Sequence, residues 1–281
     1  MSASALARCL LGLGRETLTR RHEVEFVVSP AAHDPRIPDL ASRLGKGQRI
    51  TVLTGAGVSA ASGIPTFRGQ QGLWRTFRPE QLATPDAFAR DAVLVWEWYD
   101  WRRQQVAASQ PNRAHDVLAH WSRIFDHFTL ITQNVDGLHE RAGTRGVVRF
   151  HGSIWELCCW NRCSGAPDRW LDDSTPLASL PPTCRSCGGI ARPSVVWYGE
   201  PIDPEVLNQS LAATACDLFL TIGTSALVHP AASLVSAARQ HGAFTAEINL
   251  ETTSASRRVD LVLQGRAEEL LDEIDSARPA P

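Results

Sequence analysis

A glycine-rich turn directly after an apolar run is the feature that most constrains what this chain can fold into. The run at 50–54 is unbroken and rich in β-branched residues, which is typical of a strand buried on both faces. The turn at 55–60 reads Gly-x-Gly-x-x-Ala, which lets the backbone approach a pyrophosphate with its free amides. Pro65 follows too soon for a long helix, so an ordinary dinucleotide-binding unit does not fit. Arg68 instead arrives on a loop where a cation could meet phosphate; the alternative is a structural turn with incidental glycines.

Strand-like runs alternate with helix-like segments along the rest of the chain. The strand candidates lie at 50–54, 128–132, 218–222, 244–248 and 261–263, and the helical patterns at 86–107, 114–120, 229–240 and 267–274. This alternation predicts an α/β fold, a Rossmann-like parallel sheet with helices on both faces. Glycine-rich and polar motifs follow directly after the strand candidates, where open α/β sheets bind ligands.

Cysteines, prolines and polar residues break this rhythm between residues 155 and 195, which indicates an inserted module. The sequence therefore predicts an N-terminal extension at 1–36 without an assigned role, a sheet domain at 37–154 and 196–281, and the module at 155–195. A helical insertion is expected within the sheet domain at about 70–110. The 281 residues are enough to bury a large core.

Four of the seven cysteines have the spacing of a structural metal site. Cys184 and Cys187 form a Cys-x2-Cys knuckle followed by two glycines, and Cys159 and Cys163 form a Cys-x3-Cys pair before it. Both spacings suit zinc, and four thiolates would complete its tetrahedral shell, leaving no open position for chemistry. The alternatives are disulfides, which are disfavoured in a cytosolic enzyme, or a site that has lost its metal.

The charge balance and hydropathy of the chain bear on its partners. With 28 basic and 30 acidic residues the net charge is −2, which argues against nucleic acid as an electrostatic partner. No stretch approaches the roughly 18 apolar residues of a membrane span, so no membrane partner is expected. We expect a cytoplasmic enzyme of bacterial type. The four arginines within residues 1–21 leave mitochondrial targeting as the alternative.

Six motifs, in order, resemble the signatures of one family. They lie at 55–69, 132–139, 150–153, 192–200, 223–225 and 249–251, and together they span roughly residues 38–270. Through them the chain closely resembles the sirtuins, the NAD-dependent protein-lysine deacylases. The resemblance implies NAD as co-substrate, acylated lysine on a protein or peptide as the second substrate, and nicotinamide and O-acyl-ADP-ribose as products.

The same resemblance assigns NAD contacts to several strand ends. It implies that Gln133 contacts the nicotinamide ribose, that Asp136 lies by the carboxamide and that Phe67 covers the nicotinamide face. Glu251 would accept hydrogen bonds from the adenosine ribose. The complete implied set is Gly55, Ala56, Gly57, Ser59, Ala60, Pro65, Thr66, Phe67, Arg68, Trp74, Gln133, Asn134, Asp136, Gly223, Thr224, Ser225, Asn249, Leu250, Glu251 and Ala267. Taken singly, each could be an ordinary strand-end turn.

Two residues carry the catalytic roles that the resemblance implies. His151 matches the catalytic base by position, and a histidine with a pKa near neutrality suits that work. Asn134 would lie by the nicotinamide ribose, where an amide can hold a water or a hydroxyl. His115 and His139 are ordinary structural candidates.

The resemblance also bears on the cysteines. The family pattern usually has two residues between the members of the first pair, and this chain has three. Cys159 stands at the usual distance from the histidine, which makes Cys158 the spare thiol. Which of these two cysteines binds the metal stays open at this point.

Tyr99 and Arg102 indicate which acyl group is removed. Three residues apart on a helix, they share one face, and a guanidinium beside a phenol can recognise a carboxylate. The surrounding residues 96–103 resemble the sirtuin subclass that removes succinyl, malonyl or glutaryl groups. The alternative is an amphipathic helix with a solvated arginine. By resemblance the further substrate contacts are Val195, Trp197 and Tyr198.

Pro79 departs from that subclass, whose members often have a small residue there, so acetyl-lysine is expected as a further substrate. Mono-ADP-ribosyl transfer to protein is the alternative activity, and a non-enzymatic NAD sensor is a third. The presence of Asn134, His151 and the Tyr99–Arg102 pair favours deacylation.

Overall fold

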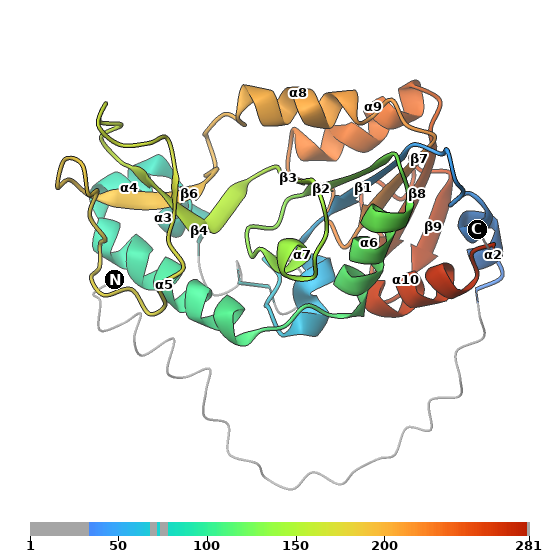
Figure 1. The fold of residues 1–281 in the computed structure, drawn as a ribbon, viewed down its shortest axis with the longest axis horizontal. Helices are drawn as coiled ribbons and strands as arrows, with labels where there is room; N and C mark the ends of the chain where they lie inside the picture. Colours follow the sequence, from blue (N-terminus) through green and yellow to red (C-terminus); the bar gives the residue numbers. More distant parts are fainter. Residues whose placement is uncertain (1–33, 68–71, 74–77, 280–281) are drawn as a thin grey trace, which may run out of the picture. The chain divides into compact units, whose positions relative to one another are not determined.

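In the computed structural model of the protein, which describes residues 34–67, 72–73 and 78–279, six parallel strands form the central sheet (Figure 1). Their order across the sheet is β3-β2-β1-β7-β8-β9. The strands are β1 (Ile50–Thr54), β2 (Phe128–Thr132), β3 (Val147–Arg149), β7 (Leu218–Ile222), β8 (Phe244–Asn249) and β9 (Leu261–Gln264). Every residue of β1 and β7 is buried, as expected for central strands covered on both faces.

Helices cover both faces of this sheet. One face is covered by α2 (Ile37–Ser42), α6 (Arg113–Ile124) and α10 (Ala267–Ser276), and the other by α8 (Pro204–Ala212), the 3-10 helix η3 (Ala231–Ser233) and α9 (Leu234–Gln240). Val52 packs in the first core with Trp121, whereas the next residue, Leu53, packs in the second core with Leu234. This alternation along one strand confirms the predicted α/β fold with helices on both faces.

The strand order indicates where a ligand-binding crevice lies in the central sheet. β1 pairs with β2 on one side and with β7 on the other, so the connections run in opposite directions from this point. In open α/β sheets, the carboxyl ends of the strands at such a point bound the crevice that binds ligands. The turns that begin at Gly55 and Gly223 follow β1 and β7 and therefore lie at its edges.

A second, three-stranded antiparallel sheet has the order β5-β4-β6 and lies beside α3, α4 and α5 (Figure 1). Its strands are β4 (Gly152–Cys159), β5 (Trp170–Leu171) and β6 (Ala191–Val195), and the helices are α3 (Pro79–Leu82), α4 (Pro85–Arg90) and α5 (Ala92–Ala108). In the pairing of β4 with β6, Gly152 lies opposite Val195 at one end and Cys159 opposite Ala191 at the other. A hydrogen bond of 2.8 Å from Trp96 Nε1 to the Ala191 carbonyl joins α5 to this sheet.

The structure differs from the sequence prediction in two helices and agrees with it in a third. The single helix expected at 86–107 is two helices, because Asp91 has φ −152° and ψ 80° and its carboxylate caps α5 by accepting from the Leu94 amide at 2.9 Å. The helix expected at 229–240 begins later, after η3. The glycine turn continues into a short 3-10 helix, η1 (Ala56–Ser62), which Gly63 ends with φ 81°. That short element agrees with the limit that Pro65 sets.

Two residues assigned to NAD by resemblance, Arg68 and Trp74, lie outside the described residues, as does most of the predicted extension. Among the helices in the described part of the chain, none combines the length and apolar character that crossing a membrane requires.

Candidate active site and metal centre

One cavity of about 1360 Å³ opens at the carboxyl ends of the parallel strands. It brings together residues from separate elements, as the motifs predicted. The predicted site residues that line it are Gly55, Ala56, Gly57, Ala60, Thr66, Phe67, Tyr99, Arg102, Gln133, Asn134, His151, Val195, Trp197, Tyr198, Gly223, Thr224, Ser225, Asn249, Leu250, Glu251 and Ala267. The other described members of the predicted set, Ser59, Pro65 and Asp136, line a small recess of about 10 Å³ that shares Phe67 and Asn134 with the cavity.

Polar side chains join the strand ends to one another. Gln133 follows β2 and donates from Nε2 to the Thr224 hydroxyl oxygen at 2.9 Å. Asn249, at the end of β8, donates to the Thr224 carbonyl at 2.8 Å. The ends of β2, β7 and β8 are therefore connected in one wall of the cavity, with Leu250 and Glu251 exposed at its rim.

His151 precedes β4 and has a defined tautomer. Its Nδ1 lies 3.1 Å from the Gln133 carbonyl oxygen, which can only accept, so Nδ1 carries the hydrogen. Nε2 then keeps its lone pair. Burial lowers the pKa of His151, which favours the neutral ring at physiological pH. The residue can therefore act as a proton acceptor.

Asn134 is oriented by two hydrogen bonds from its amide nitrogen. One goes to the Gly55 carbonyl at 3.0 Å and the other to the Ser59 hydroxyl at 3.2 Å. Ser59 in turn donates to an Asp136 carboxylate oxygen at 2.8 Å. Burial raises the pKa of Asp136, while hydrogen bonds from Leu138 and Ser59 oppose that rise. With both amide hydrogens used, the Asn134 side-chain oxygen is the atom that can accept from a hydroxyl or a water in the cavity.

Arg102 is buried at the cavity wall, so the solvated-arginine alternative is wrong. The residue is 4 % exposed and donates to the Pro65 carbonyl at 3.3 Å. Its guanidinium carbon lies 4.9 Å from the Phe67 ring centre and 5.8 Å from the Trp98 ring centre. No carboxylate of the described residues lies within 4.0 Å of this guanidinium. Burial lowers the pKa of Arg102 to about 10.

The remaining substrate-side residues follow the end of β6. Val195 is its last residue, and Trp197 is buried beside Tyr99 in the cavity wall. The Tyr198 amide donates to the Ala83 carbonyl at 2.9 Å, which ties this segment to α3. Ala83 lines the cavity, whereas Pro79, at the start of α3, is not among the lining residues.

His115 and His139 pack together beneath the site. Their ring centres are 4.8 Å apart and both rings are buried. His115 Nδ1 accepts from the Asn112 amide at 3.2 Å, and His139 Nε2 lies 3.0 Å from the Thr54 hydroxyl. Neither ring lines the cavity, which agrees with the structural role expected for them.

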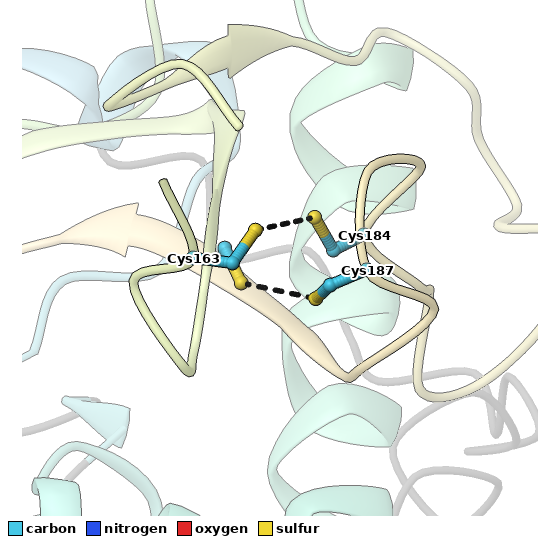
Figure 2. A group of neighbouring side chains, drawn as sticks. Cys163, Cys184 and Cys187 are labelled. Atoms are coloured by element: carbon cyan, nitrogen blue, oxygen red, sulfur yellow. Dashed lines mark hydrogen bonds between the residues drawn. The ribbon is translucent and has the colours of Figure 1, made fainter. Parts of the chain in front are cut away.

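Four cysteine sulfurs form a compact cluster at the end of the small sheet. Cys159, Cys163, Cys184 and Cys187 place their sulfurs within 4.8 Å of one another, and Figure 2 shows the thiols pointing together. The Cys159–Cys187 and Cys163–Cys184 sulfurs are 3.7 and 3.8 Å apart. A tetrahedral zinc with bonds of about 2.3 Å holds its sulfurs about 3.8 Å apart, so the cluster fits zinc.

The cluster also decides between the two adjacent cysteines. Cys159 is a member and Cys158 is not, because successive side chains of β4 point to opposite faces. All six cysteines of the described chain are free thiols, so the disulfide alternative is not realised. Zinc here would be structural, since four protein ligands leave no open position.

Sequence reasoning missed several lining residues. Trp98, Ile154, Leu227 and Val228 lie in the cavity wall without belonging to a polar motif. For Trp98 a signal was present, because residues four apart on a helix are neighbours and Arg102 lies four residues on. The others are apolar residues whose sequence context does not distinguish a cavity wall from a core.

The strand order and the cavity together define a nucleotide-binding protein of the Rossmann-like class. A model of the Sir2 family matches residues 55–230, and the chain belongs to that family. It is 46% identical over 226 residues to an NAD-dependent protein deacylase of Aquifex aeolicus, a match that covers 80% of this chain and 93% of the relative.

Two solved structures are similar to this chain over most of both lengths. A Sir2 homolog–NAD complex is 42% identical, with a TM-score of 0.77 and coverage of 85% of this chain and 92% of that one. Sir2Af2 bound to a myristoylated histone peptide is 30% identical, with a TM-score of 0.67 and coverage of 86% and 95%.

Proposed function

We propose that this protein is an NAD-dependent protein-lysine deacylase that removes succinyl and malonyl groups as well as acetyl groups. Family membership, the named deacylase relative and the NAD complex of a similar chain support the deacylase activity. The myristoylated peptide of another similar structure supports acyl-lysine on a protein as the second substrate. The acidic acyl preference is the finer part of the proposal and depends on the pocket beside α5.

The chain's own residues divide the chemistry between them. When bound, NAD would supply an electrophilic carbon, C1′ of its nicotinamide ribose, for the acyl oxygen, with nicotinamide as the leaving group. His151 accepts a ribose hydroxyl proton at Nε2, because Nδ1 already donates to the Gln133 carbonyl. Asn134 offers its side-chain oxygen to a hydroxyl or a water, since its two hydrogens are held by Gly55 and Ser59. Phe67 gives this region an apolar wall.

The buried guanidinium of Arg102 is the observation that carries the acyl preference, because the nearby charge of Asp136 stabilises it without forming a direct ion pair. A buried charge is costly unless it is paired, and no described carboxylate lies within 4.0 Å of this one. Tyr99, on the same face of α5, stays protonated because burial raises its pKa to about 12. The terminal carboxylate of a succinyl or malonyl group can form a direct ion pair with Arg102 and accept a hydrogen bond from Tyr99.

The test compares NAD-dependent removal of succinyl, malonyl and acetyl groups from one peptide by wild type, Arg102→Met and Arg102→Lys. A charge-assisted bidentate pair is worth about 1.5–3 kcal/mol, so Arg102→Met should lower the succinyl-to-acetyl ratio of kcat/KM roughly ten- to hundredfold. Arg102→Lys keeps the charge but loses the planar guanidinium, so its ratio should lie between those of wild type and Arg102→Met.

Mass spectrometry of the products separates the alternatives. A peptide that loses its acyl group to leave an unmodified lysine side chain, with formation of O-acyl-ADP-ribose, supports the deacylase, whereas a peptide that gains ADP-ribose supports the transferase. Equal losses on all acyl groups in Arg102→Met would mean that Arg102 only holds the fold, and the enzyme would be a plain deacetylase.

A further inference from the structure

The hydroxyl of Tyr99, on α5, is hydrogen-bonded to the indole of Trp197, which follows β6. Trp197 Nε1 donates to the Tyr99 oxygen at 2.9 Å, and the two residues are 2 % and 5 % exposed. Because an indole N–H can only donate, the phenol oxygen is the acceptor and the phenol hydrogen must turn elsewhere. No described residue accepts that hydrogen within hydrogen-bond distance, and both residues line the cavity.

Trp197 is itself fixed by a cluster of neighbouring side chains. The Arg192 guanidinium carbon lies 3.5 Å from the centre of its ring, and the Phe88 ring centre lies 5.2 Å away. Glu200 accepts from the Trp197 backbone amide at 2.8 Å and from Arg192 at 2.9 Å. The direction of the indole N–H is therefore set by a polar and aromatic cluster in which Arg192 and Phe88 do not line the cavity.

The phenol hydrogen is available to an acceptor in the cavity. The Tyr99 oxygen is engaged by Trp197, and Tyr99 and Arg102 both line the cavity, so a group bound there can accept from the hydroxyl beside Arg102. A hydroxyl that donates to a carboxylate forms a charge-assisted hydrogen bond, stronger than one to a neutral oxygen. An acetyl group has no oxygen at that end, so the arrangement distinguishes acidic from neutral acyl chains.

We propose that Trp197 is a positioning residue for acyl selectivity, which acts by orienting the Tyr99 hydroxyl toward the acyl carboxylate beside Arg102. This inference rests on the proposed function and extends it, because it moves part of the selectivity from α5 to the segment after β6. Trp197 contributes through its indole nitrogen and not only through the volume of its ring.

A double-mutant cycle tests the proposal, with Trp197→Phe, Tyr99→Phe and the double variant assayed on succinyl- and acetyl-peptide with NAD. Trp197→Phe keeps an aromatic ring and removes the donor. Each single variant should lower the succinyl-to-acetyl ratio of kcat/KM about three- to tenfold, as expected for one lost hydrogen bond. In the Tyr99→Phe background, Trp197→Phe should change the ratio no further, because its acceptor is already gone.

Trp160→Phe is the matched control. Trp160 packs 6.5 Å from Trp197 between ring centres and against Phe88, but its indole makes no hydrogen bond to Tyr99. This control should leave the ratio as in wild type. A ratio lowered equally by Trp160→Phe would mean that loosened packing alone explains the effect, and it would overturn the proposal.

Four other results would also overturn it. Additive effects in the double variant would show that Trp197 does not act through Tyr99. An unchanged ratio in Tyr99→Phe would show that the Tyr99 hydroxyl does not contribute to selectivity. This result would overturn the proposal even where Trp197→Phe fails to fold. A wild type without desuccinylase activity overturns the proposed acyl preference and this inference together. A succinyl-to-acetyl ratio of kcat/KM that falls in Arg102→Met but not in Trp197→Phe overturns this inference alone.

Discussion

The backbone amide of Gly57 donates a hydrogen bond of 2.8 Å to the carbonyl oxygen of Gly223. These residues follow β1 and β7, so the two glycine turns touch where the strand connections change direction. A Cβ on Gly57 would lie 2.7 Å from Gly223 Cα and 2.8 Å from its oxygen. Glycine at positions 57 and 223 therefore permits the close contact between the turns as well as the approach of a pyrophosphate.

Gly57→Ala should destabilise the protein and weaken NAD binding. The new methyl group would meet backbone atoms that cannot rotate away, and such overpacking costs about 1–3 kcal/mol. Chemical denaturation and calorimetric titration with NAD measure the two effects. Gly45→Ala is the control, because its Cβ would meet only Gln48 Cγ at 3.8 Å. Equal stability of the two variants would contradict this account of the turn contact.

His151→Ala should abolish deacylation while NAD still binds. Loss of a general base costs about 10²- to 10⁴-fold in rate, and nicotinamide exchange should survive better because the base acts after nicotinamide leaves. Since burial lowers the pKa of His151 below its ordinary 6.5, the acid limb of kcat/KM in wild type should have its midpoint below that pH. Deacylation by the variant at near the wild-type rate would assign the base to another residue.

His115→Gln should reduce the loss of stability in acid. Burial lowers the pKa of His115 to about 4 from 6.5, despite the nearby carboxylates of Asp116 and Glu140. Burial and the charge of His115 lower the pKa of His139 well below 6.5. The unfolded chain therefore binds more protons between these values, so the free energy of unfolding falls as pH drops from 6.5 toward 4.

Glutamine suits this test because it cannot titrate and can still accept from the Asn112 amide in the capping box. Denaturation across that pH range should show a fall in unfolding free energy that is smaller than in wild type by about 1–3 kcal/mol. Parallel curves for the two proteins would mean that the neutral state of His115 contributes nothing to acid sensitivity.

Cys184→Ser should lower the zinc content and unfold the small module. A structural zinc contributes on the order of 10 kcal/mol of folding free energy to such modules, and serine replaces one of four thiolates. Elemental analysis and near-ultraviolet circular dichroism provide the readouts. Cys158→Ser is the matched control and should keep one zinc per chain, because Cys158 lies outside the cluster. Active wild-type protein with far less than one zinc per chain would contradict the assignment.

The central strands could be predicted because both of their faces are covered. β1, β2 and β7 read as unbroken apolar runs, and their observed bounds match the predicted ones. β3 escaped prediction because an edge strand of three residues that ends in Arg149 carries no periodic signal. α8 also escaped, although Asp203 caps it and Pro204 begins it, because its buried side is narrow.

The site was predictable where motifs follow strands and not where burial decides the chemistry. Spacing placed Tyr99 and Arg102 on one face, but the sequence could not show that the arginine is buried. The buried face of α5 carries Arg103 beside Trp96 and Trp98, whereas the apolar Val93 is exposed, so polarity along the helix does not separate its buried face from its exposed one. The contact between Trp197 and Tyr99 joins residues 98 positions apart, which no local pattern reveals.

The pairing of β4 with β6 makes the small sheet a rigid link between the four-cysteine cluster and the active site. At one end the Val196 amide donates to the His151 carbonyl at 3.0 Å, and at the other Cys159 lies opposite Ala191. Loss of the metal would therefore misalign the imidazole of His151 and the segment that carries Trp197. The zinc ion in this fold would govern the accuracy of catalysis from a distance, without taking part in any bond that is made or broken.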